Sequence, residues 1–423
     1  MRAHHAGTAV VLLVPLVGCS LVESFDGYAD GVDAAVPLDA GGETRGDGSV
    51  DLGVDARLDD GVDAPGADAT SDLGPPDGDS APPIDAPTDL VVDTFPGPGD
   101  YLCLIGGASG TASAPVAQAE VWCAHLSGGA PEAWVAQPSL PQPLFDLAVV
   151  TDGTTIWATG GSRTDGALSS VVYASRIGAG GRLGDWTAIG ALDQGRKQHL
   201  ALLQGSTLEI YGGAGAGTDP PPNAHATLDA TSIGAWTTES TVGTTYTSAR
   251  AAGVAFVNSF YVYGGVRAGA DVTGPANRFV LPTGGGAFGV PYAQTSAKLP
   301  SPRAGLTSAL VPAVPRALAI GGQSAGVPLA DVLRARFGVG SGGEPNVLFA
   351  WETGRSLVHA RYGHAGAQSG AVIFAIGGVL DGGAITGELE RGTYDALADD
   401  VVTWELSSLP APRAFAGAAV VTL

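Results

Sequence analysis

Residues 208–213 have the sequence LEIYGG, a short run of apolar, β-prone residues that ends in a pair of glycines. The same pattern occurs five more times, at residues 102–107, 156–161, 261–265, 318–322 and 373–378. The first glycines of successive pairs are 52 to 57 residues apart, a period at which solenoids and propellers are considered first. We therefore expect six copies of one structural unit in the C-terminal three quarters of the chain.

Two further landmarks recur between the glycine pairs. An aromatic residue lies 26 to 29 residues before a pair, at Trp134, Trp186, Trp236, Tyr292 and Trp351, and Trp404 takes this place near the C-terminus. A proline-rich turn with an arginine follows the aromatic residue, most clearly at residues 299–303 (LPSPR) and 409–413 (LPAPR). One copy departs from the pattern, because residues 140–144 (LPQPL) place Leu144 where an arginine is expected.

This order of landmarks resembles the kelch repeat over about residues 100–423. The resemblance implies an all-β, six-bladed kelch-like β-propeller of four-stranded antiparallel blades at residues 99–423, because such blades bury both faces only against copies of themselves. Residues 415–423 (FAGAAVVTL) are an apolar strand without a glycine pair, and the folded part begins at Asp100 with the next strand of the unit. We expect the two ends to complete one blade together, which covers an exposed edge.

The first residues resemble a bacterial lipoprotein signal peptide. Arg2 precedes an apolar run at residues 9–17, which is far shorter than the ~20 residues that span a bilayer. Residues 16–19 (LVGC) resemble a lipobox, which implies that residues 1–18 are removed and that Cys19 carries the lipid. A plain secretory signal with an incidental cysteine is the alternative. In enteric bacteria an aspartate directly after the lipidated cysteine retains a lipoprotein at the inner membrane. Ser20 stands at that position here, which favours the outer membrane or cell surface of a bacterial cell envelope.

The composition of residues 19–98 predicts a disordered linker. Residues 20–98 hold 19 of the 42 acidic residues of the chain against two arginines, and Asp, Gly, Ala and Pro dominate the composition. Such a segment cannot bury enough apolar surface to fold. Calcium binding by these aspartates is the alternative, but the stretch lacks an EF-hand loop. The remainder is only mildly acidic and has no basic patch, so we expect no nucleic-acid partner.

Two cysteines remain besides Cys19. Cys103 and Cys123 lie on strands that we expect to be antiparallel neighbours, and an exported protein favours oxidised cysteines. We predict a disulfide between them, with two buried free thiols as the alternative.

The sequence shows no catalytic motif. The histidines of the folded part are scattered over the blades and have no usual metal-ligand spacing; they are His125, His199, His225, His359 and His364. No Gly-x-Ser-x-Gly, Walker or His-Glu-x-x-His motif is present. We therefore predict no metal site, no cofactor and no catalytic residues.

Five arginines are the chemically notable set, and all of them precede the first strand of a unit: Arg196, Arg250, Arg303, Arg361 and Arg413. In a propeller they approach the axis on the side of the loops that follow the glycine pairs. Such guanidinium groups are candidates to bind a carboxylate or an anionic sugar. In the structural alternative, each arginine binds turn carbonyls of its own or a neighbouring blade.

These features favour a membrane-anchored lipoprotein, expected to be a monomer, that displays the propeller as a module binding an envelope or surface protein or glycan. The alternative is a carbohydrate-active enzyme that resembles kelch-type sialic-acid epimerases or galactose-oxidase-like proteins. The sequence leaves open whether the chain is an enzyme, with a non-enzymatic role favoured, because a fold does not supply a function.

Overall fold

The computed structural model describes residues 97–216, 221–239, 248–267, 270–271, 275–280, 292–311 and 313–423. The predicted signal peptide, Cys19 and all but the last two residues of the predicted linker lie outside these residues. Among the described residues, no helix is long and apolar enough to span a bilayer.

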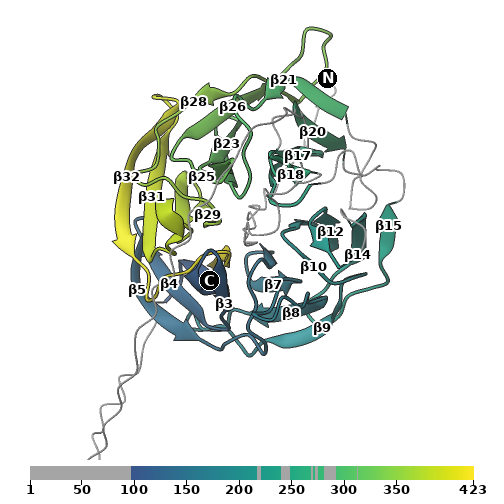
Figure 1. Cartoon of the computed structure of the whole chain (residues 1–423), viewed down its shortest axis with the longest axis vertical. Helices are drawn as coiled ribbons and strands as arrows, with labels where there is room; N and C mark the ends of the chain where they lie inside the picture. The colour runs from purple at the N-terminus through teal and green to yellow at the C-terminus, as the bar shows by residue number, and fades with distance from the viewer. Residues whose placement is uncertain are drawn as a thin grey trace, which may run out of the picture. The chain divides into compact units, whose positions relative to one another are not determined.

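The described residues form an all-β propeller of six antiparallel sheets around a central axis (Figure 1). From the axis outward, the strands are β33 (Gly417–Thr422), β1 (Asp100–Ile105), β4 (Val121–Ser127) and β5 (Ala130–Gln137) in blade 1; β6 (Ala148–Thr151), β7 (Thr155–Thr159), β8 (Val171–Arg176) and β9 (Thr187–Ala191) in blade 2; and β11 (Leu200–Gln204), β12 (Thr207–Tyr211), β14 (Asn223–Thr227) and β15 (Thr237–Glu239) in blade 3.

The other three blades repeat this arrangement. They contain β16 (Ala252–Phe256), β17 (Ser259–Tyr263), β20 (Pro275–Val280) and β21 (Tyr292–Lys298) in blade 4; β22 (Thr307–Val311), β23 (Arg316–Ile320), β26 (Val332–Gly338), β27 (Val347–Leu348) and β28 (Glu352–Thr353) in blade 5; and β29 (Ala365–Ser369), β30 (Val372–Ile376), β31 (Glu388–Asp395) and β32 (Asp400–Ser408) in blade 6. In blade 5 the outermost position is shared by β27 and β28, which both pair with β26. The predicted six blades of four antiparallel strands are confirmed.

Blade 1 contains strands from both ends of the folded part. β33 pairs antiparallel with β1, from Asp100 opposite Thr422 to Ile105 opposite Gly417. This pairing satisfies the edge of β1 that faces the axis and closes the propeller.

Side chains of the second strand in a blade alternate between two hydrophobic cores. Leu102 and Leu104 of β1 pack in one cluster with residues of blade 6, whereas Cys103 and Ile105 pack in another with residues of blade 2. Successive side chains of a strand point to opposite faces, and both faces are covered here. This explains why the repeated segments are apolar throughout.

The glycine pairs place each blade against the next one. Gly160 and Gly161 have φ angles of 60° and 99°, and the amide of Gly161 donates to the carbonyl of Arg196 at the entry to blade 3. A Cβ atom at Gly160 would lie 2.5 Å from that same carbonyl oxygen. Both the positive φ and the close approach require glycine here.

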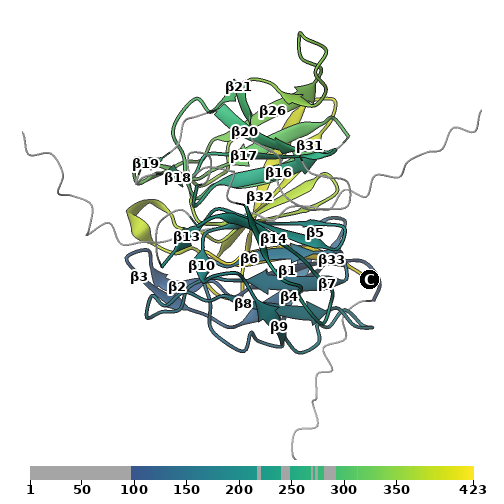
Figure 2. The same cartoon turned by 90° about the vertical axis from the view of Figure 1, so that its right-hand side faces the viewer.

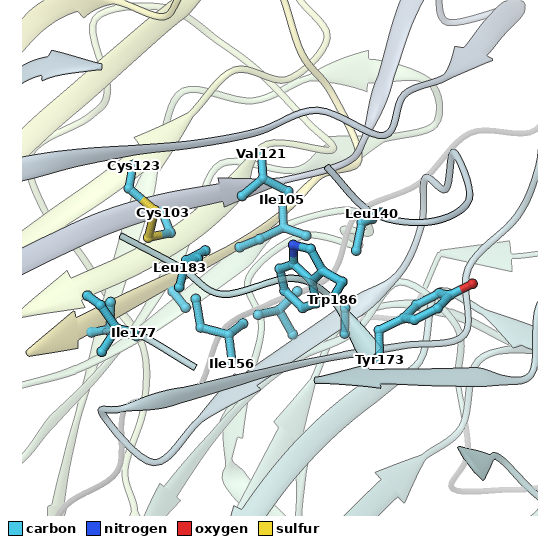
Figure 3. Packing of buried hydrophobic residues seen from close by; sticks show 14 of the residues in the cluster. Cys103, Ile105, Val121, Cys123, Leu140, Ile156, Tyr173, Ile177, Leu183 and Trp186 are labelled. Carbon is cyan, nitrogen blue, oxygen red and sulfur yellow. A yellow bond between two sulfur atoms is a disulfide. The ribbon is translucent and has the colours of Figure 1, made fainter. Parts of the chain in front are cut away.

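The recurring tryptophans also join neighbouring blades. The indole Nε1 of Trp186 donates to the carbonyl of Pro138 in the preceding blade, and Trp236 donates in the same way to Ala191. Figure 3 shows Trp186 in the cluster between blades 1 and 2, together with the bonded sulfur atoms of Cys103 and Cys123. These two cysteines are opposite each other in the β1–β4 register.

Candidate functional site

Short hairpins gather at one side of the propeller, which we call the loop face. The hairpins that follow glycine pairs are β2 (Ala108–Thr111) with β3 (Ala114–Ala117), β18 (Val266–Arg267) with β19 (Ala270–Asp271), and β24 (Gln323–Ser324) with β25 (Val327–Pro328). On the same side, β13 (Ala214–Gly215) follows a glycine pair and pairs with β10 (Arg196–Lys197) of the turn that enters blade 3. Figure 2 shows β2, β3, β10, β13, β18 and β19 together on the left. Loops on a rigid scaffold are where binding residues most often lie.

Four of the five predicted arginines occupy equivalent positions in the turns that enter the blades. Arg196, Arg303 and Arg361 are fully buried, and Arg413 is 3% exposed. The Nη1 atom of Arg361 donates to the carbonyl of Gly377, the first glycine of the same blade, at 2.9 Å. Arg196 and Arg303 make the same contact with Gly212 and Gly321.

Each of these four guanidinium groups also contacts a carboxylate. The partners lie 2.7 to 2.9 Å away and are Asp193 for Arg196, Asp331 for Arg303, Glu388 and Glu390 for Arg361, and Glu120 for Arg413. Arg413 also lies over the ring of Trp122, with 4.6 Å from Cζ to the centroid. Contacts of this kind are those of the structural alternative, in which the arginine ties the turn to the glycine pair.

Leu144 occupies the arginine position of blade 2. Its carbonyl accepts a hydrogen bond from the amide of Gly107, and in the next blade the carbonyl of Arg196 accepts the equivalent bond from the amide of Gly161. In blade 2, the residue that takes the place of the carboxylate partner differs as well. In blades 1, 5 and 6 the carbonyl that accepts from the first glycine belongs to Glu120, Asp331 and Glu388, whereas in blade 2 it belongs to Val171. Leu144 and Val171 share one hydrophobic cluster. An apolar pair therefore replaces the arginine–carboxylate pair.

Arg250 does not share the position of the other four arginines. The carbonyl that accepts from Gly213 is that of Ser248, so Ser248 takes the arginine position of blade 4. Arg250 lies two residues later, where the backbone has a φ of 64°. This shift places Arg250 in a different set of equivalent residues.

That set forms a closed ring of backbone hydrogen bonds around the axis, which we call the axial ring. Each member has a φ of 58° to 64°, and its amide donates to the carbonyl of the member in the preceding blade at 2.8 to 3.1 Å. The members are Asp146, Gln198, Arg250, Gly305, Gly363 and Phe415, one from each blade. The positive φ turns six successive N–H and C=O groups toward neighbouring blades.

The axial ring has a polar half and an apolar half. Asp146, Gln198 and Arg250 come from blades 2 to 4, and the Nε2 atom of Gln198 donates to Oδ2 of Asp146 at 3.1 Å. In the other half, Gly305 and Gly363 leave space that aromatic rings occupy. A Cβ atom at Gly363 would lie 2.1 Å from the ring of Phe415.

The charge of Arg250 acts on a side chain of another blade. Burial raises the pKa of Tyr362, and Arg250, two blades away, lowers that pKa again. Tyr362 is 8% exposed and Arg250 is 9% exposed, so both are nearly covered. Arg250 is the cation among the six ring members; its amide donates to the carbonyl of Gln198, and its charge acts on the phenol of Tyr362. Polar side chains of these types are ones that orient small polar ligands in binding sites.

The five histidines do not gather in one place. His199 and His364 are fully buried, and each Nε2 atom contacts a threonine hydroxyl, Thr159 at 2.9 Å and Thr307 at 2.8 Å. Burial lowers the pKa of both imidazoles to about 3, and the neighbouring Arg196 and Arg361 add to this. They are therefore neutral parts of the core.

The other histidines each contact a glutamate. His125 lies 3.1 Å from Glu132 and His359 lies 2.9 Å from Glu388. His225 contacts Glu239 in blade 3.

Asp146 and Gln198 were not among the residues predicted from the sequence. Each lies 14 residues before the first glycine of its own blade, as do Arg250 and Gly363, but Gly305 lies 16 residues before Gly321, so the offset alone does not identify the position. The varied residue types hide this set, since only the backbone conformation is shared.

No protein-family model matches the chain, and no curated protein sequence matches it. Among solved structures, that of YjhT is similar, with a TM-score of 0.52 and 14% sequence identity, over 74% of this chain and 99% of that chain. At this identity the similarity shows a shared propeller fold and nothing about the ligand.

Proposed function

We propose that this chain is a membrane-anchored lipoprotein that presents a kelch-type propeller as a binding module, and that its loop face binds a carboxylate-bearing glycan. The observation that carries the proposal is the place of Arg250 on the axial ring. The other four repeat arginines are engaged with glycine carbonyls and carboxylates of the blades. Arg250 belongs to the set of residues that surrounds the axis.

The chemistry of the axial ring suits an anionic sugar. A guanidinium group forms two parallel hydrogen bonds with a carboxylate, which gives both affinity and orientation. Gln198 and Tyr362 add an amide and a hydroxyl that suit sugar hydroxyl groups. The hairpins of the loop face surround the axial ring, and their side chains would determine which glycan binds.

The anchor places this module in the bacterial cell envelope. Cys19 carries the lipid in this proposal, and the acidic linker of residues 19–98 separates the propeller from the outer membrane or cell surface. Several acyl chains hold a protein on a membrane stably, whereas one chain alone binds marginally. Cys19→Ser should therefore move the chain from the membrane fraction to the soluble fraction. Unchanged partitioning of that variant would contradict the anchor.

The test of binding is a glycan array probed with the chain that carries Cys19→Ser, followed by titration of each glycan that binds. We expect saturable binding to glycans with a carboxylate and a loss of affinity of at least about tenfold on Arg250→Ala, the loss of one charged hydrogen-bonded contact. Arg176→Ala is the matched control, because Arg176 is exposed at the end of β8 away from the loop face.

Equal affinities of the Arg250→Ala and Arg176→Ala chains would contradict a role of the axial ring. Capture of envelope proteins without glycan binding would contradict the glycan and favour a protein ligand. Conversion of a bound sugar into a new product would instead support a carbohydrate-active enzyme.

A further inference from the structure

Three metal-ligating side chains of blade 3 converge on one point. Glu209 of β12, His225 of β14 and Glu239 at the end of β15 each present a ligand atom, and the three atoms lie within 4.8 Å of one another. His225 is directly opposite Glu209 in the register of β12 and β14. Glu239 is opposite Asn223, two residues from His225 on the same face of the sheet. The Nδ1 atom of His225 lies 3.3 Å from Oε1 of Glu239.

The cluster lies in the contact between blades 3 and 4. On β12, Leu208 and Ile210 pack toward blade 2, so Glu209 and Tyr211 point the other way. Tyr211 packs with Phe260 and Phe279 of blade 4. The carboxylates are therefore placed at a largely apolar interface.

Burial makes the charges of this cluster costly. Glu209 is fully buried, Glu239 is 5% exposed, and the side chain of His225 is 16% exposed. Two carboxylates this close repel each other, and removal from water raises the free energy of each charged form. A divalent cation between them turns the repulsion into attraction, and imidazole is a further ligand for the same ion.

We propose that Glu209, His225 and Glu239 bind a zinc ion. Two carboxylate oxygens and one imidazole nitrogen are zinc ligands, and three protein ligands with one open position form a known type of zinc site. Ligand atoms around a tetrahedral zinc ion are about 3.4 Å apart, given bonds of about 2.0–2.2 Å. The contact between His225 and Glu239 already has this length, so small side-chain rotations close the site. The inference is independent of the glycan proposal.

Zinc at this place joins the second, third and outermost strands of blade 3. Calcium and magnesium suit the site less, because both prefer oxygen ligands and larger coordination numbers. The ion would hold the end of β15 to the strands nearer the axis.

The test uses the full chain, treated with a chelator and then titrated with zinc. We expect one zinc per chain by calorimetry and a zinc-dependent rise in melting temperature, with no comparable rise for magnesium or calcium. Glu209→Gln and Glu239→Gln should each weaken binding by more than about 100-fold, because loss of an outer-shell partner alone costs about 10- to 100-fold. Cobalt in place of zinc gives a visible absorption spectrum that reports the ligands without reference to stability.

Glu132→Gln is the matched control, because Glu132 contacts His125 in blade 1 at 3.1 Å in a similar pair of histidine and glutamate. This variant should bind zinc as the unchanged chain does. The inference is overturned if zinc does not bind, or if the Glu209→Gln and Glu239→Gln chains bind zinc and show the cobalt spectrum as the unchanged chain does.

Discussion

The amide of Asp146 donates a 2.9 Å hydrogen bond to the carbonyl of Phe415, although the two residues lie near opposite ends of the folded part. This bond joins blades 2 and 1 and is one of six equivalent bonds in the axial ring. Closure of the propeller therefore has two components, the pairing of β1 with β33 and this bond at the axis.

The close approach of the Phe415 ring to Gly363 predicts that two glycine-to-alanine substitutions differ in their effect on stability. Gly363→Ala and Gly305→Ala place alanine at nearly the same φ, 60° and 62°, at a cost of about 1–2 kcal/mol each. Only the first new Cβ meets the ring of Phe415, at 2.1 Å, whereas the nearest atom at Gly305 is 3.4 Å away. Gly363→Ala should destabilise the chain by about 1–3 kcal/mol more in denaturant unfolding. Equal losses would mean that the Phe415 ring moves freely.

The arginine turn predicts a large loss of stability on Arg361→Met. Arg361 and Glu390 are both fully buried, and removal of one partner leaves an uncompensated charge. Breaking such a pair costs about 3–5 kcal/mol, measured as the change in free energy of unfolding. Arg391→Met is the control in the same blade, because its partner Glu405 is 58% exposed, and it should cost at most about 1 kcal/mol. Comparable losses in the two variants would argue against the structural role.

The pair of Leu144 and Val171 predicts a measurable coupling. Leu144→Arg alone buries a cation with an apolar neighbour, so we expect strong destabilisation. Adding Val171→Glu recreates the pair that Arg361 makes with Glu388. A double-mutant cycle should give a favourable coupling of about 1–3 kcal/mol. Additive effects would show that the two positions do not exchange as a unit.

The disulfide predicts a response to reductant. Cys103 and Cys123 close a loop with a sequence separation of 20 residues, which corresponds to about 3 kcal/mol in the chain-entropy model. In the chain with Cys19→Ser, we expect no free thiol in denaturant before reduction and two after it. Reductant should lower the melting temperature of that chain but not of one that also carries Cys103→Ala and Cys123→Ala. Two free thiols without reductant would rule out the disulfide.

The buried histidines predict a loss of stability in acid. The pKa of His199 and of His364 is about 3 in the folded chain, below the ordinary value of 6.5. Between these values the unfolded chain binds a proton that the folded chain does not, so stability is complete above pH 6.5 and falls toward pH 3. Each histidine contributes a slope of about 1.4 kcal/mol per pH unit. His364→Gln should reduce the measured slope by that amount, and an unchanged slope would contradict the neutral core histidine.

Much of the fold could be predicted because each blade repeats the same short sequence patterns. The glycine pairs at Gly160 and Gly212 recur since every blade needs the same positive φ and the same close approach. The candidate site was harder to predict. Arg250 follows its turn as the other arginines do, yet a shift of two residues moves it from the turn to the axial ring.

The sequence by itself determined the number of blades, the apolar character of the second strands and the closure by residues 415–423, because these depend on patterns repeated along the chain. Only the tertiary structure decided that Asp146, Gln198 and Arg250 share the axial ring and that Glu209, His225 and Glu239 converge. Both groups depend on strand register and on contacts between residues far apart in sequence. A slip of one residue turns every side chain of a strand to the other face, so composition and spacing cannot determine such contacts.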